Sequence, residues 1–209
     1  MTQPKCVFTD LGNVVLFFDR FRVPQALSGT LVKKSPAEID AIINGEDGME
    51  LLRLFESGLL TPEEYAICLE KMLGFKLPRD RFWPIHNDIF WRNEAVIDLY
   101  RKMKIDSPEV KLFALTNTDA QRVGRMIKLS GLSFQGVVAS FHSGVKAMKP
   151  RVRIFEFALD RSEVKPEESL FIDDIAEYVQ AAKALGMHAH HYSAPHLLEE
   201  ELRRFNLIR

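Results

Sequence analysis

Cysteine is scarce in this chain of 209 residues, which contains Cys6 and Cys68 alone and no Cys-x-x-Cys spacing. Lone, widely separated cysteines are typical of reduced thiols, and they argue against the disulfide frameworks of small secreted domains. This usage predicts a cytoplasmic location.

Long apolar runs and blocks of like charge are also missing. No stretch approaches the roughly 20 apolar residues of a membrane-spanning helix, and residues 1–5 lead into a strand pattern and not into a signal-peptide core. The 28 basic and 29 acidic residues give a net charge of −1 without a long basic run. We therefore expect neither a membrane nor a nucleic acid as a partner. The sequence does not predict the oligomeric state.

The chain does contain an alternation of strand and helix patterns. With 46% hydrophobic and 27% charged residues, it can bury a core of ordinary composition. Short apolar runs and helical spacing predict strands at 5–9, 110–115, 136–140, 169–172 and 188–192, and helices at 93–103, 119–129, 150–159 and 176–185. This order predicts an α/β fold with a parallel sheet and right-handed crossovers.

Residues 20–91 differ from the rest because they show helical patterns without a convincing strand. Ser35 to Glu38 and Thr61 to Glu64 are capping boxes, each with a proline in the first helical turn. We interpret 20–91 as a helical cap that is inserted after the first strand, and 1–19 together with 92–209 as the α/β core. Such an insert would cover the carboxyl end of the first strand.

Four apolar segments of the core end in polar groups. Asp10 follows the first strand, Thr116 and Asn117 follow the second, and the pair Asp173-Asp174 follows a later one, while Lys149 precedes a helix. Because the carboxyl ends of strands in an open α/β sheet line one crevice, we expect these groups to converge. Taken singly, each has a structural interpretation as a turn, helix-cap or surface residue. Together they are suited to metal-assisted attack on a phosphate ester.

In this interpretation Asp10 is a nucleophile that forms an aspartyl phosphate. An anion that attacks a phosphate needs cations nearby, and Lys149 and a divalent metal can provide them. Mg²⁺ prefers oxygen ligands, so the carboxylates of Asp10 and Asp174 and the carbonyl of Gly12 are the expected metal ligands. Thr116 and Asn117 lie at a strand end before a helix, a common place for holding phosphate oxygens.

The chain resembles the haloacid dehalogenase (HAD) superfamily of phosphatases. The resemblance covers about residues 5–192, and it lies in the segments Thr9–Val15, Leu115–Thr118, Met148–Pro150 and Phe171–Asp174, which match the four superfamily motifs in order. It implies a Rossmann-like, doubly wound parallel sheet with an inserted helical cap.

The sequence Asp-Leu-Gly-Asn at 10–13 is similar to the glucose-1-phosphate phosphatase branch, which is akin to the N-terminal phosphatase domain of soluble epoxide hydrolase. Residues 55–61 look like the helix-turn-helix of that branch's cap. The resemblance also implies catalytic roles for Asp10 and Lys149, phosphate binding by Thr116, Asn117 and Lys149, and metal binding by Asp10, Gly12 and Asp174, with Asp173 in support.

Two positions depart from the superfamily pattern. Most phosphatases of the superfamily place a second Asp, the general acid and base, two residues after the nucleophile, where this chain has Gly12. We therefore expect weak activity, or a preference for leaving groups that need little protonation; Asp19, His86 or Glu56 are candidates to replace the missing group. Tyr178 stands where Asn or Asp is usual, which predicts weaker metal binding.

The sequence thus predicts a Mg²⁺-dependent hydrolase, a phosphatase that acts on a small phosphorylated metabolite such as a sugar phosphate. Three alternatives remain open. The chain can be a catalytically impaired member that binds a phosphorylated ligand or a protein partner, a metal-independent 2-haloacid dehalogenase, or a phosphoryl-transferring mutase. The paired acids at 173 and 174 argue against a dehalogenase, because without a bound cation they would repel an anionic substrate.

Overall fold

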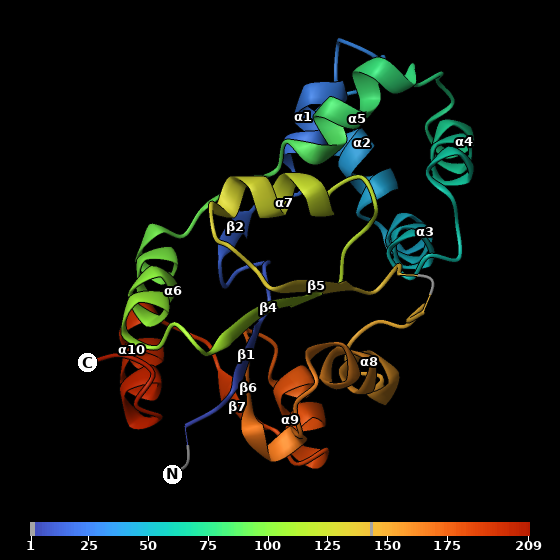
Figure 1. Ribbon diagram of the computed structural model, residues 1–209. Helices are drawn as coiled ribbons and strands as arrows, with labels where there is room; N and C mark the ends of the chain where they lie inside the picture. The colour runs from blue at the N-terminus through green and yellow to red at the C-terminus, as the bar shows by residue number, and fades with distance from the viewer. Residues whose placement is uncertain (1–2, 143) are drawn as a thin grey trace.

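A five-stranded parallel sheet forms the centre of the computed structural model, which describes residues 3–142 and 144–209 (Figure 1). The strand order is β5-β4-β1-β6-β7. The strands are β1 (Cys6–Thr9), β4 (Lys111–Thr116), β5 (Gly136–Ala139), β6 (Ser169–Asp173) and β7 (His188–His191). The predicted α/β fold is confirmed, and each predicted strand is present with ends shifted by one residue at most.

The central strand β1 lies where the sheet changes direction. The chain continues from β1 to β4 and β5 on one side, and then returns to β6 and β7 on the other. Thr9 is in register with Ala114 of β4 and Ile172 of β6, so the carboxyl ends of all three strands lie at one level. Ligands of open α/β sheets bind at such a switch point.

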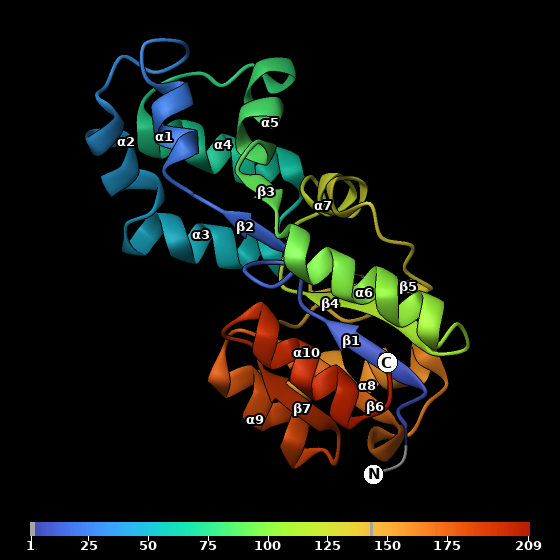
Figure 2. The same cartoon turned by 90° about the vertical axis from the view of Figure 1, so that its left-hand side faces the viewer.

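Helices cover both faces of the sheet, because β1, β4 and β6 are buried on both sides (Figure 2). One face, with Val7 of β1, packs against α6 (Glu94–Asp106) and α10 (Pro195–Arg204). The other face, with Phe8 of β1, packs against α8 (Val152–Ser162) and α9 (Ala176–Ala184). Alternate residues of one strand therefore enter separate hydrophobic clusters, as the period of a β-strand requires.

A second group of helices stands at the carboxyl edge of the sheet (Figures 1 and 2). These helices are α1 (Arg22–Leu27), α2 (Pro36–Ile43), α3 (Glu46–Glu56), α4 (Pro62–Leu73) and α5 (Arg79–Asn87). The predicted capping boxes are present at the start of α2 and α4. We call α1 to α5 the cap; the exact division at 19/20 and 91/92 remains our interpretation.

A two-stranded antiparallel ribbon connects the cap to the core. It consists of β2 (Leu16–Phe18) and β3 (Phe90–Arg92), and it was not predicted. Strands of three residues are too short to show a convincing alternation in the sequence. The segment that enters the cap and the segment that leaves it therefore pair with each other. Because the first of them follows Asp10 closely in the chain, the cap stands over Asp10.

Two core helices begin later than their patterns predict. The helix expected at 119 is α7 (Val123–Ser130), because Asp119 instead accepts hydrogen bonds from the backbone N–H groups of Gln121 and Arg122. The helix expected at 150 begins at Val152, after a turn in which Arg151 N–H donates to Met148 O. Among the described residues, no helix is both long and apolar enough to cross a bilayer.

The contact of the cap with the core at Gly58 leads to a prediction about stability. Gly58 has φ +70°, and an added Cβ would lie 2.6 Å from the carbonyl oxygen of Phe141 in the core. A left-handed backbone conformation costs a residue with a Cβ about 1–2 kcal/mol. Gly58→Ala is expected to lower the free energy of unfolding by more than this amount, because the added Cβ also meets the Phe141 carbonyl. Gly74→Ala is the matched control, because Gly74 has φ +77° and open space around it. Equal losses in urea denaturation would contradict a tight contact at Gly58.

Candidate active site

The carboxylate of Asp10 is held at the carboxyl end of β1. Its backbone N–H donates to Ile172 O at 2.9 Å and extends the pairing of β1 with β6. The side chain is largely buried, and Lys149 Nζ lies 3.0 Å from its Oδ1. This contact is an ion pair, and Oδ1 accepts no hydrogen bond within the described chain. The Asp10 carboxylate can therefore take a further ligand in addition to the Lys149 ammonium.

Lys149 joins three strands through its ammonium group. Nζ donates to Asp173 Oδ2 at 2.5 Å and to Leu115 O at 2.9 Å, in addition to its ion pair with Asp10. The side chain is buried. Burial alone lowers the pKa of Lys149, but the nearby charges of Asp10 and Asp173 raise it above its ordinary value. The ammonium therefore stays charged beside the Asp10 carboxylate.

Two further side chains hold Lys149 in place. Asn117 accepts from Lys149 N–H at 2.8 Å and donates to Lys149 O at 3.1 Å, and it also lies 3.4 Å from the hydroxyl of Tyr178. The ring of Tyr178 is 5.4 Å from Nζ, within the range of a cation–π contact. Tyr178 thus contacts Asn117 and Lys149, a position that the sequence did not indicate. The Asn117 side-chain amide is engaged with the backbone of Lys149.

The three acids cluster as expected, but they have different partners. Asp10, Asp173 and Asp174 each offer a carboxylate oxygen within 4.8 Å of the others. Asp173 uses both oxygens, because Oδ1 accepts from Ile175 N–H at 2.9 Å and Oδ2 accepts from Lys149. Asp174 is half-buried, and among the described residues its carboxylate accepts one hydrogen bond, from Asn13 Nδ2 at 3.2 Å. Asp10 and Asp174 are therefore the carboxylates with oxygens to spare, while Asp173 fixes Lys149.

This donor set fits a divalent cation. Burial, and then the charge of Asp10, raises the pKa of Asp174 above its ordinary value. Burial likewise raises the pKa of Asp173 to about 6, although Lys149 opposes the shift. Three acids beside one ammonium leave an excess of negative charge in a largely buried space. Mg²⁺ would relieve that excess, with Asp10, Asp174 and the nearby Gly12 as its oxygen ligands.

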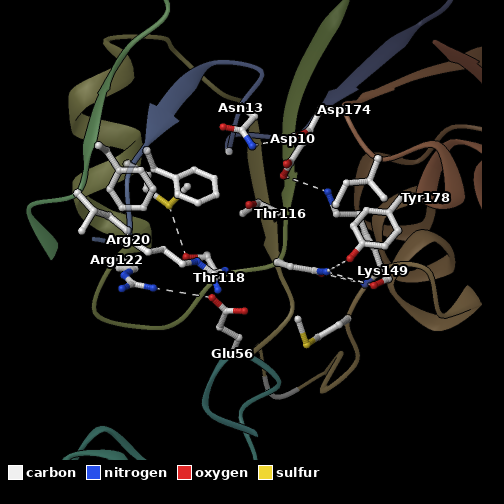
Figure 3. A pocket seen from close by; sticks show the side chains of 18 of the residues that line it. Asp10, Asn13, Arg20, Glu56, Thr116, Thr118, Arg122, Lys149, Asp174 and Tyr178 are labelled. Carbon is white, nitrogen blue, oxygen red and sulfur yellow. Dashed lines mark hydrogen bonds and ion pairs between the residues drawn. The ribbon is translucent and has the colours of Figure 1, made fainter. Parts of the chain in front are cut away.

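A pocket of about 240 Å³ joins the strand ends to the cap (Figure 3). On the core side it is lined by the predicted residues Asp10, Gly12, Thr116, Asn117, Lys149 and Asp174. The Thr116 hydroxyl is buried and makes no hydrogen bond to residues 3–142 or 144–209, so it is available to a ligand. The structure thus brings all the predicted site residues to one cavity.

The cap side of the pocket contains groups that sequence reasoning missed. They are Arg20 and Arg53 from the cap segment and Arg122, which precedes α7 of the core. Arg122 is buried and donates to His86 O at 3.3 Å. Arg20 donates to Met49 Sδ at 2.9 Å, and it has no carboxylate within 4.0 Å in the described part of the chain. Isolated arginines carry no sequence signal, because most are solvated surface residues.

The structure places the three candidates for the missing acid at different sites. Asp19 lies outside the pocket lining, and its Oδ1 accepts from Phe21 N–H. His86 lies in a different cavity, 3.3 Å from Asp119, and burial and the charge of Arg122 lower its pKa to about 4. Glu56 alone of the three lines the pocket that contains Asp10.

Comparisons with known proteins agree with this geometry. Residues 86–186 match the family model of the haloacid dehalogenase-like hydrolases. Mouse acyl-CoA dehydrogenase family member 10 is 25% identical over 179 residues, which are 84% of this chain and 16% of that protein. The chain thus spans about a sixth of this curated relative.

Two solved structures share the fold. A HAD family enzyme of Bacteroides thetaiotaomicron, in complex with magnesium and inorganic phosphate, is 21% identical with a TM-score of 0.73, over 91% of this chain and 95% of that one. L-2-haloacid dehalogenase of Xanthobacter autotrophicus, with chloropropionic acid covalently bound, is 16% identical with a TM-score of 0.64, over 98% and 83%. These two likenesses show the fold, and the family match covers residues 86–186. Similarity to the glucose-1-phosphate phosphatase branch stays a prediction.

The different partners of the two paired acids predict different effects on metal binding. Asp174→Asn is expected to weaken Mg²⁺ binding at least about tenfold, because it removes a charged ligand from a cluster of anions. Isothermal titration of the protein with MgCl₂ measures this. Glu177→Gln is the control, since Glu177 is exposed in the first turn of α9. An Asp174→Asn variant with unchanged affinity would exclude Asp174 as a ligand.

Proposed function

We propose that this chain is a Mg²⁺-dependent phosphatase that hydrolyses a small organic phosphate monoester through an aspartyl phosphate on Asp10. One observation carries the proposal: at the switch point of the sheet, a carboxylate that is ion-paired with a buried ammonium, and whose paired oxygen accepts no hydrogen bond within the described chain, lies beside two further acids. An anionic nucleophile that attacks a phosphate dianion needs compensating charge on both sides. Lys149 supplies it on one side, and bound Mg²⁺ supplies Lewis-acid stabilisation of phosphate oxygens on the other.

The residues of this chain divide the reaction between them. An oxygen of Asp10 attacks phosphorus, and the bond from phosphorus to the leaving oxygen breaks. The Lys149 ammonium offsets the charge of the nucleophile and of the transferred phosphoryl group, and the Thr116 hydroxyl donates to one of its oxygens. Water then hydrolyses the aspartyl phosphate and restores Asp10. Asp173 acts through Lys149, which it holds at 2.5 Å.

The pocket supports a small, polar substrate. Its volume of about 240 Å³ falls below the range of about 300–1,000 Å³ that is typical of sites for drug-sized ligands. Arg20 and Arg122 give its far end donors for hydroxyl or acidic groups. A phosphorylated sugar or similar metabolite of the cytoplasm has the size and polarity that fit this space.

A 2-haloacid dehalogenase is the main alternative within this fold, since one such enzyme shares it. That reaction uses an aspartate nucleophile without a metal. Here Asp174 faces the nucleophile with oxygens to spare, which favours a cation and hence a phosphate. A second alternative is a protein that binds a phosphorylated ligand without turnover, and Gly12 in place of the usual acid favours it.

Phosphorylation of Asp10 by acetyl phosphate tests the proposal. Acetyl phosphate has a good leaving group, so it is expected to form an aspartyl phosphate in the presence of Mg²⁺, and intact-protein mass spectrometry detects the adduct. Asp10→Asn is expected to abolish the adduct and the hydrolysis of p-nitrophenyl phosphate, while Asp19→Asn, outside the pocket, retains both. Absence of the adduct in the wild-type chain, with phosphate binding intact, would favour the binding protein.

A further inference from the structure

Glu56, the last residue of α3, brings a carboxyl group from the cap into the pocket opposite Asp10 (Figure 3). It is largely buried, and its carboxylate oxygens make no hydrogen bond within the described chain. The cation in contact with it is Arg122, with Nη1 at 3.9 Å from Oε1. Because Glu56 lines the pocket, a ligand bound there can supply the hydrogen bond that the described chain does not give its carboxyl group.

The backbone of Glu56 is hydrogen-bonded to the core, which fixes the position from which its side chain extends into the pocket. The buried Ser140 hydroxyl donates to Glu56 O at 2.5 Å and accepts from Thr118 N–H at 3.1 Å. Thr118 follows Thr116 and Asn117 in the loop after β4 and lines the same pocket. A single hydroxyl thus ties the end of α3 to the loop that carries the phosphate-binding residues.

A side chain at the position that usually carries the second acid would lie in tight contact with Phe18. A Cβ on Gly12 would lie 3.2 Å from Cε1 of Phe18 and 3.8 Å from Oδ2 of Asp10. The ring of Phe18 therefore limits the space beside Gly12 that a longer side chain would need. Any acid that acts on the leaving group must enter the pocket from elsewhere, and Glu56 does so from the cap.

The charge state of Glu56 suits a group that both gives and takes a proton. Burial raises its pKa to about 7; Arg122 and Arg20 oppose this shift, and Asp119 and Asp10 add to it. A carboxyl group with such a pKa is present in both protonation states near neutral pH.

We propose that Glu56 is the general acid for the leaving group and the general base for the attacking water, in place of the residue missing at Gly12. The inference rests on the proposed phosphatase function. As Asp10 forms its bond to phosphorus, the electron pair of the breaking bond goes to the ester oxygen, which takes the Glu56 proton and leaves as an alcohol. The Glu56 carboxylate then accepts a proton from water as the water oxygen bonds to phosphorus. The electron pair of the second breaking bond returns to Asp10.

Leaving groups of different basicity test this assignment. In Glu56→Gln, hydrolysis of glycerol phosphate, an alkyl ester that needs protonation, is expected to fall ~10²–10⁴-fold in kcat. Phosphorylation of Asp10 by acetyl phosphate, which needs no acid, is expected to keep its rate. The adduct is expected to persist longer than in the wild-type chain, because its hydrolysis lacks a base. Intact-protein mass spectrometry over time measures formation and decay separately.

Two control variants, and the pattern of results, distinguish a failure of the role of Glu56 from a failure of the phosphatase function. Glu46→Gln, exposed at the start of α3, is expected to match the wild type, and Glu56→Asp is expected to recover part of the alkyl ester activity. If Glu56→Gln slows acetyl phosphate and alkyl esters equally, or slows neither, Glu56 is not the acid while the phosphatase function stands. If the wild-type chain forms no adduct, both are overturned.

Discussion

The site depends on one buried ammonium group shared by two carboxylates. Lys149 lies within 3.0 Å of both Asp10 and Asp173, and removal of its ammonium would leave two buried carboxylates without this cation. Its hydrogen bond to Leu115 O adds β4 to the contacts with the ends of β1 and β6. Asn117 and Tyr178 complete the enclosure. The ion pair therefore fixes three strand ends relative to one another, and the direction of the Asp10 carboxylate follows from it.

The excess negative charge of the acid cluster favours a cation at this position. Lys149 compensates one of three carboxylates, and the pKa of Asp173 and of Asp174 is raised mainly by burial and also by Asp10. Protonation is one way to relieve such repulsion, and a divalent cation is the other. In the proposed function, a cation held by Asp10 and Asp174 would add to the charge of Lys149 and favour the binding of a phosphate dianion.

The sequence predicted the parts of the site that follow from strand ends. Asp10, Thr116 and Asp174 each come after a buried apolar run, and the parallel pattern alone places such residues together. The ribbon of β2 and β3 is too short for its period to be seen, and Arg20 and Arg122 carry no pattern at all. The roles of Asn117 and Tyr178 also depended on distances, because each contacts Lys149 from a different element. A sequence pattern does not predict the tertiary contacts of single side chains.

In the proposed mechanism the sheet carries the nucleophile and the cap carries the acid, and the limited space around Gly12 accounts for this arrangement. The proposed nucleophile and the charged groups beside it lie at three strand ends, whereas the proposed acid enters from α3, where Ser140 and Gly58 contact the other side of the boundary between cap and core. A group that must meet the leaving oxygen also contacts the variable part of the substrate. An acid on the cap therefore links proton transfer to recognition of that part, because a substrate that fails to fit beside Arg20 and Arg122 would misplace its ester oxygen. Phosphoryl transfer to Asp10 would remain possible for such a substrate only where the leaving group departs without a proton.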